Sequence, residues 1–92
     1  MTIPTKFECM GSTITVEIKR LKDDGQYKPR KQLILLSDDI GEEAQEQTFW
    51  HEWMHCALSH LDYKELDENE QFVEQMAQCL YQLQKSRVDK RK

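Results

Sequence analysis

The sequence predicts an α+β domain in which a small N-terminal antiparallel or mixed sheet is followed by two packed helices. Apolar runs typical of strands occur before residue 37, and apolar residues at helical spacing dominate after it. A length of 92 residues allows one hydrophobic core and therefore one domain. We expect the sheet region at residues 1–36, the first helix at 37–61, the second helix at 67–86 and a basic tail at 87–92.

Three segments of the N-terminal part have the pattern of strands. Residues 12–19, STITVEIK, alternate apolar and polar side chains, which predicts a strand with one buried face. Residues 6–10, KFECM, are joined to it by Gly11 and are expected to form a hairpin with it. The continuous apolar run at 32–36, QLILL, predicts a strand covered on both faces, and Pro29 just before it indicates either the entry to that strand or an unpaired edge.

Two helices are predicted in the C-terminal part. The apolar stripe of the first consists of Trp50, Trp53, Met54, Ala57, Leu58 and Leu61. Asp39 and Glu42 have the spacing of a capping box at its start. The stripe of the second consists of Phe72, Val73, Met76, Ala77, Leu80 and Leu83. Asp67 or Asn69 is expected to cap this second helix.

Composition describes a protein that works in water. Charged residues make up 33% of the chain, and no apolar run is long enough to cross a bilayer. Three widely spaced cysteines, Cys9, Cys56 and Cys79, argue against a disulfide framework and for a reducing compartment. The N-terminus has no basic flank followed by an apolar segment, so no secretory signal is expected. These features predict a cytoplasmic protein with no membrane partner.

The charge distribution argues against a nucleic-acid partner for the chain as a whole. The net charge is −4, and basic and aromatic residues are not interleaved. The exception is the basic tail, whose cations are Lys85, Arg87, Lys90, Arg91 and Lys92. We interpret the tail as a solvated helix end whose cations suit the helix dipole, with a contact to RNA, DNA or an acidic partner as the alternative.

Residues 48–58, TFWHEWMHCAL, contain a candidate metal site. His51 and His55 are four residues apart, so on a helix their side chains lie one turn apart and can reach one cation. Glu52 follows the first histidine and projects beside the position of a metal-bound water, where a general base is needed. The HExxH pattern on an amphipathic helix therefore predicts zinc, and two packed histidines without metal are the alternative.

A zinc site that catalyses a reaction commonly has three protein ligands. The residues that could supply the third ligand are Glu70, Glu74, His60, Asp62, Asp67 and Cys79. Glu70 and Glu74 are four residues apart and share one face of the second helix. His60 is rotated away from the histidine pair and is interpreted as a helix-end cation. Asp67 is interpreted as a helix cap, and Cys79 as a core residue.

HEWMH, followed after fifteen residues by Glu70 in NEQFVEQMAQCL, resembles the minimal gluzincins, the short HExxH metallopeptidases of phage and prokaryotic genomes. The resemblance covers residues 32–83. It implies a zincin-like core that binds one zinc ion per chain through His51, His55 and Glu70. It also implies that Glu52 is the general base.

The same resemblance implies peptide hydrolysis without a covalent intermediate. Zinc lowers the pKa of its water to about 7 and polarises the scissile carbonyl, and Glu52 passes the water proton to the leaving amine. Glu74 occupies the position at which larger gluzincins have an aspartate that hydrogen-bonds the first histidine. Tyr63 lies between the histidine helix and Glu70, where larger gluzincins often place a tyrosine that stabilises the oxyanion, and Tyr27 is the other candidate.

The expected partner is a protein or peptide substrate, held in extended form along an edge strand of the sheet. Either residues 26–30, QYKPR, or residues 32–36, QLILL, provides that edge. One alternative function is a zinc-stabilised interaction module or regulator that hydrolyses nothing. The other is a basic-tailed nucleic-acid binder. Glu52, an acid beside the open metal position, favours hydrolysis over the zinc-stabilised module. The negative net charge argues against the nucleic-acid binder.

Overall fold

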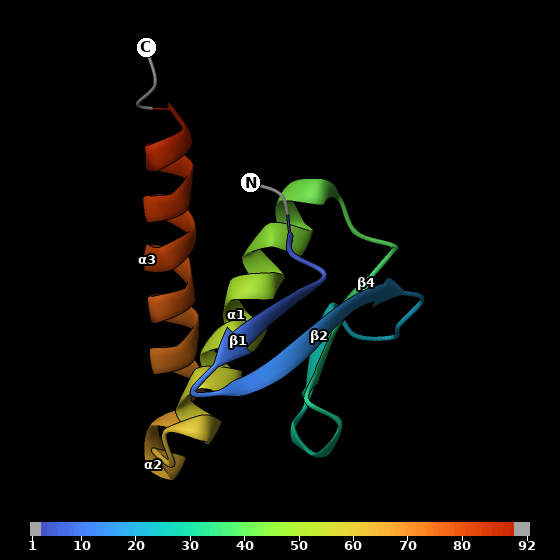
Figure 1. The fold of residues 1–92 in the computed structure, drawn as a ribbon. Helices are drawn as coiled ribbons and strands as arrows, with labels where there is room; N and C mark the ends of the chain where they lie inside the picture. The colour runs from blue at the N-terminus through green and yellow to red at the C-terminus, as the bar shows by residue number, and fades with distance from the viewer. Residues whose placement is uncertain (1–2, 90–92) are drawn as a thin grey trace.

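A four-stranded mixed sheet packs on one side of a long helix in the computed structural model, which describes residues 3–89 (Figure 1). The strands are β1 (Lys6–Cys9), β2 (Ser12–Lys19), β3 (Gly25–Lys28) and β4 (Leu33–Ser37), in the order β1-β2-β4-β3. β1 and β3 run antiparallel to their neighbours, whereas β2 and β4 are parallel. The predicted α+β class with an N-terminal sheet is therefore confirmed.

The helices follow the sheet along the chain. They are α1 (Glu42–His60), the short α2 (Lys64–Asp67) and α3 (Glu70–Asp89). The sheet covers one side of α1, and α3 packs against another, so α1 is the middle layer (Figure 1). None of the helices in the described part of the chain has the length and apolarity that a membrane span requires.

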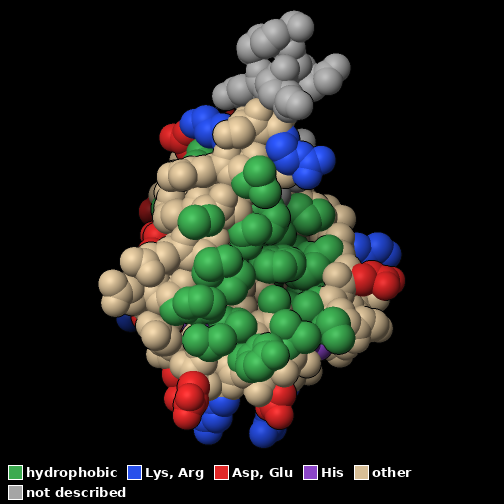
Figure 2. Space-filling model, turned by 90° about the vertical axis from the view of Figure 1, so that its left-hand side faces the viewer, with side chains coloured by type: hydrophobic (Ala, Val, Ile, Leu, Met, Phe, Trp, Pro, Cys, Tyr) green, Lys and Arg blue, Asp and Glu red, His purple; other side chains and the backbone are tan. Residues whose placement is uncertain are grey.

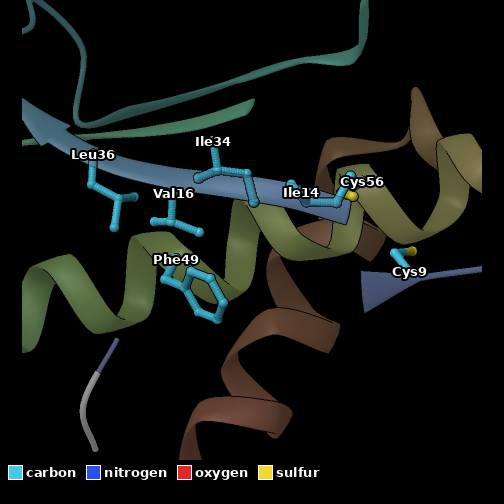
Figure 3. Packing of buried hydrophobic residues seen from close by; sticks show 7 residues of the cluster. All are labelled: Cys9, Ile14, Val16, Ile34, Leu36, Phe49 and Cys56. Carbon is cyan, nitrogen blue, oxygen red and sulfur yellow. The ribbon is translucent and has the colours of Figure 1, made fainter. Parts of the chain in front are cut away.

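The core lies between the sheet and α1 (Figure 3). Its buried members are Cys9, Ile14, Val16, Ile34, Leu36, Phe49 and Cys56. The alternation of β2 buries Ile14 and Val16 as predicted, although Ile18 at the far end of the strand is 50% exposed. A second cluster, formed by Met54, Leu58, Val73 and Ala77, joins α1 to α3. α1, which carries His51 and His55, therefore packs against the sheet on one side and α3 on another.

The sheet order decides between the two candidate edge strands. β4 lies between β2 and β3, and Ile34, Leu35 and Leu36 are buried. The apolar run is therefore a central strand, which confirms the predicted burial on both faces. Of the two alternatives for Pro29, the unpaired edge is wrong. β3 is an edge strand, and it lies against α1. A short 3-10 turn, Pro29–Lys31, connects β3 to β4.

α1 begins later than the sequence predicted. Ser37 still pairs within β4, so the segment that follows forms a turn before the helix starts at Glu42. The predicted capping box is wrong, because Gly41 is the N-cap and no side chain caps the helix. The backbone N–H of Asp39 instead donates to the hydroxyl of Ser37 over 3.0 Å.

α3 begins at Glu70 and is capped by Asn69, one of the two predicted caps. The backbone N–H of Phe72 donates to Asn69 Oδ1 over 3.1 Å. The other predicted cap, Asp67, lies at the end of α2, a helix that was not predicted. α3 continues to Asp89 and so includes the start of the predicted basic tail, whereas residues 90–92 lie outside the described part.

One cation near the basic end of α3 is paired with a carboxylate of α1. Lys85 Nζ lies 2.9 Å from Glu43 Oε2, and the hydroxyl of Tyr81 donates to the same oxygen over 3.0 Å. The hydrogen bonds from Lys85 and Tyr81 lower the pKa of Glu43, and the charge of Lys85 lowers it further. Lys85 therefore joins α3 to the first turn of α1 instead of being only a solvated cation.

One side of α3 adds to an apolar surface. The helix buries Val73, Ala77 and Tyr81, while Met76 is 37% and Leu83 56% exposed. Hydrophobic side chains form a broad patch on the side of the molecule where α3 lies (Figure 2). Cys79, predicted as a core residue, is exposed. The prediction is wrong because none of the described helices and strands covers Cys79 on this face of α3.

Gly25 allows β3 to approach α1 closely. A Cβ at this position would lie 2.5 Å from Thr48 Cγ2 and 3.3 Å from Glu52 Cγ. We expect Gly25→Ala to lower the free energy of unfolding by about 1–3 kcal/mol, which is the usual cost of overpacking. Urea denaturation measures this loss. Gly41→Ala is the control, because a Cβ there meets nothing within 4 Å, and we expect a loss of about 0.5 kcal/mol. Equal losses in the two variants would contradict the close approach.

Candidate metal centre

α1 and α3 bring together three side chains that could hold a metal ion. His51 and His55 lie on adjacent turns of α1, Glu70 opens α3, and the three ligand atoms lie within 4.8 Å of one another. The two Nε2 atoms each lie 3.3 Å from a different oxygen of Glu70. Bonds of about 2.0–2.1 Å to one tetrahedral zinc ion would separate such N and O atoms by about 3.4 Å. The predicted ligand trio therefore has the spacing that one ion requires.

Each histidine of the trio has a carboxylate on its other nitrogen. His51 Nδ1 lies 2.9 Å from Glu74 Oε1, and His55 Nδ1 lies 2.7 Å from Asp67 Oδ1. An ionised carboxylate only accepts, so each Nδ1–H donates and leaves the Nε2 lone pair available. Such a partner fixes the ring and the tautomer of metal-ligating histidines. Both lone pairs then face Glu70.

The contact of Glu74 agrees with the sequence prediction, but the role of Asp67 was missed. Asp67 ends α2, which packs against α1, and this short helix turns the carboxylate back toward His55. The sequence contained no clear indication of that turn. Asp67 lies three residues before Glu70, a spacing that also suits a helix cap.

Glu52 lies beside the two histidines and is only 8% exposed. Burial raises the pKa of Glu52, with His51 and His55 opposing the rise and Glu70 adding to it. Burial by itself lowers the pKa of His55, but the hydrogen bond to Asp67 and the charge of Glu70 outweigh it, so the net shift is upward. The site therefore combines a buried carboxyl group of raised pKa with two oriented imidazoles.

Two hollows border Glu52 along α1. The upstream hollow, about 390 Å³, is lined among others by Asp24, Gln47, His51, Glu74 and Gln78. The downstream hollow, about 340 Å³, is lined by Tyr27, Pro29, Glu52, His55, Ser59 and Asp67. Gly25 of β3 borders the first and Tyr27 of β3 borders the second. The edge strand therefore runs past Glu52 from one hollow to the other.

The two candidate tyrosines lie in different places. Tyr63 is 56% exposed and lines a separate hollow with Asp62 and Leu66. Tyr27 borders the downstream hollow, but its hydroxyl is buried with no hydrogen-bond partner in the described part of the chain, and burial raises its pKa. Tyr27, and not Tyr63, is the tyrosine that the structure brings beside the trio.

Comparisons with protein-family models, with curated proteins and with solved structures found no match to this chain. The support for a function therefore comes from the sequence pattern together with the geometry of the trio, its two carboxylate partners and Glu52.

The two partner carboxylates are expected to contribute unequally to metal binding. Asp67→Asn should weaken zinc binding by about 10- to 100-fold, because asparagine cannot hold the His55 ring as an ionised acceptor. Glu74→Gln should have the smaller effect, since the side chain of Glu74 is 54% exposed and that of Asp67 29%. Competition with a chromophoric chelator measures both affinities. The control is Glu65→Gln, an exposed acid of α2. An equal loss in this control would indicate a general charge effect.

Proposed function

We propose that this chain is a zinc-dependent metallopeptidase of the minimal gluzincin type. The observation that carries the proposal is the convergence of His51, His55 and Glu70 with a buried carboxyl group, Glu52, next to them. A site that only held the fold together would need no such acid outside the ligand set. The expected reaction is hydrolysis of a peptide bond.

The donor set of two imidazoles and one carboxylate suits zinc better than the other common divalent ions. These ligands are intermediate between hard and soft, as zinc is. His51, His55 and Glu70 would hold the ion, while Glu74 and Asp67 keep the two rings oriented. When bound, zinc acts as a Lewis acid that polarises a carbonyl and makes water a nucleophile at neutral pH.

Glu52 is proposed as the general base and proton carrier. Its carboxylate takes the proton of the attacking water and returns it to the amine that leaves. Burial raises the pKa of Glu52, which favours retention of the proton between these two steps. β3 approaches the Glu52 side chain closely, because a Cβ at Gly25 would lie 3.3 Å from Glu52 Cγ.

β3 is the proposed platform for the substrate. It is an edge strand, so an extended peptide can add to it by main-chain pairing, with side chains entering the hollows on either side of Glu52. Asp24 and Glu74 in the upstream hollow, together with Gln47 and Gln78, favour a polar or basic side chain there.

The absence of disulfides among Cys9, Cys56 and Cys79 supports a cytoplasmic location for the enzyme.

A peptide mixture that samples all residue pairs tests the proposal. The zinc-loaded chain is incubated with the mixture under reducing conditions, and new termini are identified by mass spectrometry. We expect cleavage that stops when zinc is removed by a chelator and resumes when zinc is restored. A chain that binds zinc at the trio and cleaves no peptide would contradict the proposal.

The alternative is a zinc-stabilised interaction module without hydrolytic activity. The apolar face on the α3 side, with Met76 and Leu83 exposed, is the observation that favours it (Figure 2). This function predicts a folded, zinc-bound chain whose partner binding depends on Met76 or Leu83 and is unaffected by Glu52→Gln.

A further inference from the structure

We propose that Cys9, Cys56 and His60 hold a second metal ion, of a thiophilic kind such as zinc, between the end of β1 and the last turns of α1. The ligand atoms of these three residues lie within 4.8 Å of one another. This thiol site shares no residue with the trio of His51, His55 and Glu70, and it does not depend on peptide hydrolysis.

The thiol site repeats the arrangement of the trio on the same helix. Cys56 and His60 are four residues apart on α1, as His51 and His55 are, and the third donor comes from another element. That donor is Cys9, the last residue of β1. Cys9 and Cys56 lie beside each other at one end of the core (Figure 3).

The separation of two of the ligand atoms agrees with tetrahedral coordination. Cys56 Sγ lies 3.7 Å from His60 Nδ1. Bonds of about 2.3 Å from zinc to sulfur and about 2.0 Å to nitrogen would place these atoms about 3.6 Å apart. The two sulfur atoms supply the soft ligands that select zinc or copper over magnesium and calcium.

His60 is expected to be the weakest of the three ligands. Its Nδ1 lies 2.9 Å from the backbone carbonyl oxygen of Cys56, to which Nδ1–H donates a hydrogen bond. Coordination through Nδ1 exchanges this hydrogen bond for the bond to the metal. The loss of His60 should therefore weaken the site, whereas the loss of either sulfur should abolish it.

The surroundings of the two sulfur atoms contain a donor for a coordinated sulfur. Cys56 is fully buried, and Cys9 is 9% exposed. Burial raises the pKa of the Cys56 thiol, so the metal has to displace the thiol proton when it binds. The hydroxyl of Tyr27 is buried and has no hydrogen-bond partner of ordinary geometry within residues 3–89, and Cys56 is one of the groups that raise its pKa. A coordinated sulfur carries more negative charge than a thiol and is a better acceptor for this unpaired donor.

Cobalt(II), a spectroscopic substitute for zinc, distinguishes the two sites in the full-length chain. Sulfur ligands give a thiolate-to-cobalt charge-transfer band in the near ultraviolet, and the trio contains no sulfur. Under reducing conditions we expect this band to saturate at one ion per chain. Native mass spectrometry should show two ions per wild-type chain and one in the Cys9→Ser and Cys56→Ser variants, both without the band.

Two further variants complete the test. His51→Ala should keep the sulfur band, and Cys79→Ser, which alters the exposed cysteine, should keep both the band and the second ion. Far-ultraviolet circular dichroism checks that each variant is folded before metal is added. If Cys56→Ser does not fold, Cys9→Ser and His60→Ala still decide, with loss expected in the first and weaker binding in the second. A wild-type chain without the band, or a band that survives Cys9→Ser, would overturn the proposal.

Discussion

Glu52→Gln is expected to keep zinc at the trio and to reduce peptide hydrolysis by about 100- to 10,000-fold. The glutamine has nearly the shape of the glutamate, so the packing beneath β3 should be preserved. It cannot accept a proton from water, however, and it cannot return one to the leaving amine. Because Glu52 is not one of the three ligands, zinc content should stay at the wild-type level.

The measurement compares initial rates on a peptide that the wild-type chain cleaves, with zinc content determined in the same samples. Glu42→Gln is the matched control, since it neutralises an exposed glutamate in the first turn of the same helix. We expect this control to retain wild-type hydrolysis. Full activity in Glu52→Gln would exclude this residue as the general base, and loss of zinc would show a structural role instead.

Local sequence patterns predicted most of the elements that carry the site. The helical period places His51 and His55 on one face of α1 whatever the rest of the chain does. The alternation of β2 likewise predicts burial on one face, and the continuous apolar run of β4 predicts burial on both faces. Glu70 followed from the resemblance to a family, and the structure brings it to the two histidines.

The features that the sequence did not predict depend on contacts between distant segments. Asp67 reaches His55 only because α2 turns the chain back before α3. Cys79 has the spacing of a core residue, but it is exposed because no layer covers that face of α3. Cys9 and Cys56 are 47 positions apart and meet only when β1 packs beside α1. Spacing along the chain does not encode such contacts.

The position of β3 also depends on tertiary packing. The sequence left two candidate edges, and the parallel pairing of β2 with β4 places β4 in the centre and β3 at the edge. Gly25 then permits the close approach to Thr48 and Glu52 that brings this edge over the site. In the sequence, Gly25 is part of a turn cluster, and a turn alone explains a glycine there. The sequence therefore did not indicate its packing role.

Glu70→Ala is expected to remove zinc from the trio, with a larger loss of affinity than the 10- to 100-fold expected for the partner carboxylates. The substitution leaves two imidazoles from one helix and removes the only ligand of the trio that α3 supplies. The ion then no longer joins α1 to α3. We therefore expect the stabilisation of the fold by zinc to disappear together with the binding.

Thermal unfolding provides a second measurement of the same loss. Free zinc at about 100 times its dissociation constant should stabilise the folded chain by about 2.7 kcal/mol, which corresponds to a rise in Tm of about 10–20 °C for a domain of this size. The comparison is made in a Cys9→Ser background, so that only the trio contributes. Glu70→Ala should abolish the rise, and Glu65→Ala, an exposed acid of α2, should keep it. An unchanged rise in Glu70→Ala would mean that the histidines bind zinc without α3, and that Glu70 is only a neighbour of the site.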